Sequence, residues 1–261
     1  MEVKRARAAI HSSPSRLPQR VAELPGIMWT LPCLRGLQWG SRGGMPGSVT
    51  RSHLLVLSAA STLLAVLAGI FVDQPVALWI AAHDQSALWE RVVTILEYPA
   101  GITPWTWTIP IMLTGGVLAT LAVTRWRRYA RSWMYIALVY LLTRNLMGWG
   151  KTLTGRYRPS QWIKLGGSTF GHLGDGVAFP SGHVTVFGGL VLPLVMIYPR
   201  LRPLLVVIPF VMIARVAVLA HFVSDVLGGL SLTAFVAWAC APLIIGPASS
   251  ASAPAAAPAR R

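Results

Sequence analysis

Residues 151–159 read KTLTGRYRP, residues 180–183 read PSGH, and residues 215–225 read RVAVLAHFVSD. These segments interrupt long apolar runs. Together they supply cations, two imidazoles, a hydroxyl, a glycine and a carboxylate, on Lys151, Arg158, Arg215, His183, His221, Ser181, Gly182 and Asp225. Such groups are typical of a site that binds a phosphate with two bases beside it. We interpret the apolar remainder as a scaffold that holds these segments on one side of a membrane.

The composition is typical of a membrane protein. Of the 261 residues, 54% are hydrophobic and 12% are charged, whereas soluble domains carry about 25% charged residues. The net charge is +15, and the basic residues cluster between apolar runs. The positive-inside rule explains this pattern better than nucleic-acid binding does. Two cysteines, Cys33 and Cys240, are too few for a disulfide framework.

The apolar runs predict an all-α bundle with six transmembrane helices, because each run approaches the ~20 residues that a helix needs to cross hydrocarbon. Between the first two spans, residues 73–103 combine tryptophans with acidic residues and predict an interfacial helix, with a plain loop as the alternative. The basic residues 1–53 and the small residues 247–261 are expected to be disordered tails. The predicted spans are 54–72, 104–123, 132–149, 182–198, 203–221 and 226–246.

The basic residues also predict the orientation. With six spans, the basic N-terminal tail, the second and fourth connections and the C-terminus all fall on the same side, which the positive-inside rule makes cytoplasmic. The three polar segments then meet at the outer ends of the spans. The third connection places Lys151, Arg156, Arg158 and Lys164 outside, against that rule. This exception indicates that these cations bind something.

The cations and the PSGH segment suit an anionic phosphate. Arg158 and Arg215 can bind it through forked hydrogen bonds, and Lys151 can act as a point charge. The segment around Ser181 precedes an apolar run, so its N–H groups are expected to open a helix, where anions bind readily. Gly182 lets the backbone approach closely, and the serine adds a hydroxyl donor.

The two histidines and the carboxylate suggest covalent catalysis. We expect His221 to attack phosphorus, and His183 to protonate the leaving alkoxide and later to activate water. Asp225 lies four residues after His221, within reach of its ring. It is expected to fix the tautomer and to stabilise the imidazolium, as the carboxylate of a catalytic triad does.

The spacing Lys-x6-Arg-Pro, then Pro-Ser-Gly-His, then Arg-x5-His-x3-Asp resembles the signature of the type 2 phosphatidic acid phosphatase family, which is related to vanadium haloperoxidases. The resemblance covers about residues 54–246. One position departs from it, because Ala214 stands where the family usually has serine and removes one hydroxyl donor. The resemblance implies metal-independent catalysis without a cofactor, with His221 phosphorylated, His183 as general acid, Asp225 as partner of His221, and Lys151, Arg158, Ser181, Gly182 and Arg215 on the phosphate.

The sequence therefore predicts a membrane phosphatase that hydrolyses a lipid phosphate monoester or isoprenoid pyrophosphate at the outer face through a phosphohistidine. Its expected partners are that lipid and the bilayer, and no nucleic acid. Three alternatives stay open: a lipid phosphotransferase with the same phosphohistidine, a vanadate-dependent haloperoxidase, and a non-catalytic lipid-phosphate binder. The histidines and the carboxylate count against the binder, because binding alone needs only the cations.

Overall fold

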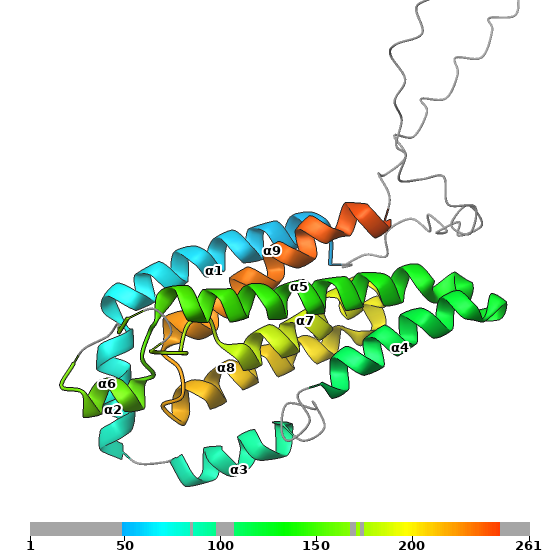
Figure 1. Cartoon of the computed structure of the whole chain (residues 1–261). Helices are drawn as coiled ribbons and strands as arrows, with labels where there is room; N and C mark the ends of the chain where they lie inside the picture. The colour runs from blue at the N-terminus through cyan, green and yellow to red at the C-terminus, as the bar shows by residue number, and fades with distance from the viewer. Residues whose placement is uncertain (1–48, 84–85, 98–106, 168–170, 173–174, 246–261) are drawn as a thin grey trace, which may run out of the picture. The chain divides into compact units, whose positions relative to one another are not determined.

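The computed structural model describes residues 49–245 except 84–85, 98–106, 168–170 and 173–174, all within one unit, Trp39–Arg261. This described part is helical (Figure 1). Short 3-10 helices, η2 (Thr124–Tyr129) and η3 (Pro199–Val206), precede two of the α-helices. The α-helices are α1 (Arg51–Phe71), α2 (Asp73–His83), α3 (Ser86–Glu97), α4 (Thr108–Ala122), α5 (Ala130–Thr154), α6 (Pro159–Lys164), α7 (Gly182–Ile197), α8 (Val207–Ala217) and α9 (Val223–Ile245).

Each predicted span contains a helix, so the all-helical class is confirmed. Within the described residues, α1 and α9 are long and apolar enough to cross a membrane, while α4 and α7 are apolar but shorter, with 15 and 16 residues. The six-span count stays a prediction. α1 begins three residues before its predicted span because Thr50 and His53 form a capping box at its start.

The fifth predicted span, 203–221, is wrong at both ends. The segment begins as η3, where Pro203 cannot donate a backbone hydrogen bond. α8 then ends at Ala217, and the turn to α9 uses residues 218–222 instead of the predicted 222–224. His221 therefore lies in a turn and not at the end of a helix.

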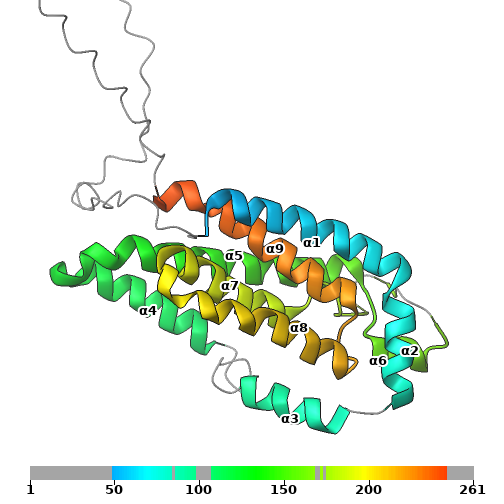
Figure 2. The same ribbon diagram turned by 180° about the vertical axis from the view of Figure 1, so that it is seen from behind.

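α1 runs beside α9 in both views (Figure 1 and Figure 2). Hydroxyl side chains join the two helices: Ser58 Oγ donates to the carbonyl of Ser231 at 3.1 Å, and the hydroxyls of Thr62 and Ser231 lie 2.6 Å apart. Small polar residues of this kind let membrane helices approach closely. On the other side of α9, Tyr135 of α5 is fully buried and donates to the carbonyl of Ala237 at 2.8 Å. α9 thus lies between α1 and α5.

Residues 73–97 form two helices, α2 and α3, where the sequence predicted one interfacial helix over 73–103. Residues 98–103 of that prediction lie outside the described residues. α3 contacts α8, and Asp73 at the start of α2 is buried. The location of this segment at a membrane interface stays a prediction.

Candidate active site

A sharp turn at the end of α5 brings Lys151 and Arg158 to one place. Gly155 ends the helix in the left-handed conformation, with φ of 55°, and its N–H donates to the Lys151 carbonyl at 3.2 Å. A Cβ at this position would lie 2.3 Å from the His172 carbonyl oxygen. Both the backbone conformation and the close approach therefore require glycine here.

The start of α7 places backbone and hydroxyl groups next to the end of α5, where Lys151 lies. Ser181 precedes the helix and is fully buried, and its backbone N–H donates to the carbonyl of Asp225 at 3.0 Å. Its Oγ makes no helix-capping bond and has no hydrogen-bond partner among the described residues. A Cβ built on Gly182 would lie 3.6 Å from Lys151 Nζ. An ammonium group and a helix N-terminus thus meet, which is an arrangement that binds anions.

The turn between α8 and α9 holds His221 against Asp225. The backbone N–H of His221 donates to the Arg215 carbonyl at 3.3 Å, and the side chain is buried. Asp225 lies in the first turn of α9, where Oδ2 accepts the Phe222 N–H at 2.8 Å and so caps the helix. Oδ2 is 3.7 Å from Nδ1 of His221, which is longer than a hydrogen bond. The two residues are neighbours as predicted, without a direct hydrogen bond.

Burial and neighbouring charges set the protonation of this site. Burial lowers the pKa of Lys151 to about 8, and the charges of Arg158 and Arg215 act in the same direction while Asp225 opposes them. Burial also lowers the pKa of His221, although Asp225 raises it. The histidine in the turn is therefore neutral at pH 7 and keeps the lone pair that a nucleophile needs.

The second histidine, His183, lies close to Arg215. His183 is half-buried in the first turn of α7 and lines a small cavity together with Arg215 and Ala214. Val93 of α3 closes this cavity. The methyl group of Ala214 thus occupies the wall where a serine would offer a hydroxyl. All eight residues singled out in the sequence come together at one end of α5, α7, α8 and α9.

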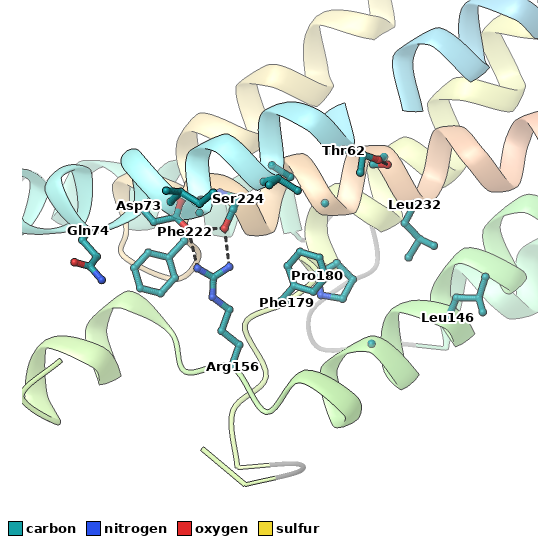
Figure 3. Close-up of a pocket in the computed structure, with 17 residues that line it drawn as sticks. Thr62, Asp73, Gln74, Leu146, Arg156, Phe179, Pro180, Phe222, Ser224 and Leu232 are labelled. Atoms are coloured by element: carbon teal, nitrogen blue, oxygen red, sulfur yellow. Dashed lines mark hydrogen bonds and ion pairs between the residues drawn. The ribbon is translucent and has the colours of Figure 1, made fainter. Parts of the chain in front are cut away.

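A buried charged network, which the sequence analysis missed, lies next to these residues (Figure 3). Arg156 Nη2 donates to Asp73 Oδ2 at 2.6 Å, and Nη1 donates to Asp225 Oδ1 at 2.6 Å and to Ser224 Oγ at 2.6 Å. The guanidinium also stacks 4.6 Å from the centre of the Phe222 ring. One signal was available: Asp73 directly follows a predicted span, and a carboxylate there needs a cation.

Beside this network lies a cavity of about 660 Å³ between α1, α5 and α9. Most of its lining is apolar and includes Ala65, Leu146 and Leu232, whereas Asp73 and Arg156 form its polar end (Figure 3). Gly150 and Pro180 also line it, and each is adjacent in sequence to a predicted phosphate-binding residue. The cavity therefore approaches the cationic site from the side of α1 and α9.

The described residues contain no group of three or more His, Cys, Asp or Glu side chains that could hold a metal ion. Residues 132–245 match the family model of the PAP2 superfamily. This match confirms the family resemblance and covers α5 to α9 with all eight predicted site residues; α1 to α4 lie outside it. No match was found among curated proteins or among solved structures.

Proposed function

We propose, from the match of residues 132–245 to the model of the PAP2 superfamily, whose members are phosphatases, that this chain is a membrane phosphatase acting on a lipid phosphate or isoprenoid pyrophosphate. One observation carries the proposal: the charges of Lys151 and Arg215 act on a buried, neutral His221, and Arg158 and the N-terminus of α7 lie next to that lysine. Cations alone would serve a binder. A neutral imidazole among them serves nucleophilic attack on phosphorus.

In the proposed reaction, Lys151, Arg158 and Arg215 hold the phosphate oxygens together with Ser181 Oγ and the Gly182 N–H. The His221 nitrogen on the far side from Asp225 attacks phosphorus, and the bond from phosphorus to the leaving oxygen breaks. His183 gives its proton to that oxygen. It then takes a proton from water, whose oxygen attacks phosphorus, and the N–P bond breaks to release phosphate and restore the free imidazole.

The apolar surroundings favour a lipid over a water-soluble substrate. The cavity beside the site has the size of small-molecule pockets, about 300–1,000 Å³, and it is lined by the two helices suited to cross a membrane. A hydrocarbon chain in this cavity would place its headgroup at the end next to the cationic site. We place that end at the outer membrane face, with both termini cytoplasmic, on the positive-inside rule.

The proposal is tested by phosphate release from purified, detergent-solubilised protein in excess EDTA. The substrates are phosphatidic acid, phosphatidylglycerol phosphate, a polyprenyl pyrophosphate and a short water-soluble phosphate. We expect EDTA-resistant release that is fastest with long-chain substrates. Equal rates on the short phosphate would refute the lipid assignment, and lipid retention without release would favour the binder. Labelled phosphate transferred to an added lipid alcohol would identify a phosphotransferase.

A cavity-filling substitution makes this test specific to the hydrocarbon chain. Ala65→Phe should lower kcat/KM on long-chain lipids more than about tenfold, since each methylene left in water costs about 0.8 kcal/mol, and should spare the short phosphate. Leu64→Phe is the control, because Leu64 is exposed on α1 and does not line the cavity. Equal losses on both classes of substrate would exclude the cavity as the chain site.

The low pKa of Lys151 predicts a pH dependence. The amine is cationic below pH 8 and neutral above it, since its pKa is about 8, so phosphate attraction should weaken as the pH rises. We expect kcat/KM, which reports the free enzyme, to fall above pH 8. Lys151→Arg should move this fall to higher pH because the guanidinium stays charged. If kcat/KM of Lys151→Arg fell at the same pH as that of the wild type, the titrating group would be another residue.

A further inference from the structure

The network around Arg156 joins two parts of the chain that only the fold brings together. Asp73, at the start of α2, lies 83 positions from Arg156 and outside the residues that match the PAP2 model. Its Oδ1 accepts the backbone N–H of Ser224 at 2.9 Å, so this carboxylate contacts the start of α9 directly. Arg156 connects it to Asp225, the carboxylate next to His221.

We propose that Asp73 and Arg156 are positioning residues, which hold the Asp225 carboxylate in the orientation that directs Oδ2 toward Nδ1 of His221. This inference rests on the proposed function of the site. It assigns a role in the site to α2, which carries Asp73. It also gives Arg156 a different role from that of Arg158, which is placed on the phosphate.

The hydrogen bonds show how the orientation is fixed. Oδ1 of Asp225 accepts from Arg156 at 2.6 Å, and Oδ2 accepts from the Phe222 N–H at 2.8 Å. With one oxygen held from each side, the carboxylate cannot turn. Arg156 is itself held by Asp73, by Ser224 and by the Phe222 ring. Removing Arg156 therefore leaves Oδ1 of Asp225 without its donor, and removing Asp73 takes away one of the groups that hold this arginine.

The network also sets the charge that His221 experiences. Asp225 from α9, Arg215 from α8 and Lys151 from α5 act on the charge of this histidine. Asp73 from α2 lines a small cavity together with it, and Arg156 from the turn after α5 pairs with Asp225. Within the network, the carboxylates of Asp73 and Asp225 face the single guanidinium of Arg156 and the positive end of α9. Loss of the guanidinium makes the surroundings more negative and favours the imidazolium. Loss of the Asp73 carboxylate makes the surroundings more positive and favours the neutral imidazole.

Two charge-removing variants therefore predict shifts of opposite sign. In Arg156→Gln, the acid limb of the pH profile of kcat/KM should move upward by about half a pH unit or more. In Asp73→Asn it should move downward by a similar amount. The same titration is read without turnover by NMR of protein labelled with ¹⁵N-histidine, with His221→Asn to assign the signal. This second readout keeps the inference testable even if the wild type hydrolyses none of the substrates.

A conservative variant and a matched control separate positioning from general stability. Arg156→Lys keeps the charge but cannot bond Asp73 and Asp225 together, so kcat should fall about tenfold or more with KM within about twofold. Ser58→Ala removes a buried hydrogen bond between α1 and α9 at a distance from the charges. It should lower thermal stability and leave the pH profile in place.

The results that overturn the inference are specific. If Arg156→Gln and Asp73→Asn lost activity without any shift of the acid limb or of the His221 titration, that result would show that the network has a structural role only. Full kcat in Arg156→Lys would do the same. Absence of phosphate release by the wild type would instead refute the proposed function, and the NMR shifts would still decide whether the network acts on His221.

Discussion

Replacing His221 with asparagine should abolish phosphate release from every substrate and lower kcat at least about 10³-fold, because the covalent route is lost with its nucleophile. Asparagine fills most of the buried volume, so the turn between α8 and α9 should survive. Wild-type protein mixed rapidly with ³²P-labelled lipid should show an acid-labile, base-stable phosphoenzyme. The variant should show none while still binding the lipid.

The matched control is His83→Gln. His83 is an exposed histidine at the end of α2 whose ring stacks on Trp79, and it is not among the eight predicted site residues. It should retain wild-type rates. If the His221 variant kept a phosphoenzyme, another side chain would have to be the nucleophile, and the assignment of the two histidines would be reversed or wrong.

Replacing His183 with glutamine should produce the second largest loss, about 10²- to 10⁴-fold on a lipid phosphate, as expected when a general acid is removed. The size of the loss should depend on the leaving group. A nitrophenyl phosphate releases a stable anion that needs no proton, so the first step should remain fast. Water activation is the same for both substrates, so a burst of nitrophenolate should be followed by slow turnover.

Rapid-mixing kinetics of the nitrophenyl substrate check this expectation. The burst amplitude should equal the enzyme concentration in the His183 variant and should vanish in the His221 variant. If His183→Gln slowed the first step equally for both leaving groups, His183 would not be the general acid. Its position near Arg215 in the small cavity would then indicate phosphate binding instead.

The sequence predicted that the eight site residues meet. Successive predicted spans cross the membrane in opposite directions, so the three polar segments all fall on the same side of it. The sequence could not place His221 in a turn, since the apolar run continues to the histidine and hides the end of α8 at Ala217. Asp73 was missed for another reason. A long-range pair between a carboxylate and a cation leaves no periodicity, and Arg156 stands among several similar cations.

The α1–α9 interface has a consequence for biogenesis. α1 emerges from the ribosome first, whereas α9, which carries Ser231, Ser224 and Asp225, is made last among the described helices. Until then, Asp73 lacks both the backbone N–H of Ser224 and the network that Asp225 completes. The site thus stays incomplete until α9 has been made. With the proposed function, a nascent chain should therefore release no phosphate before α9 has docked against α1.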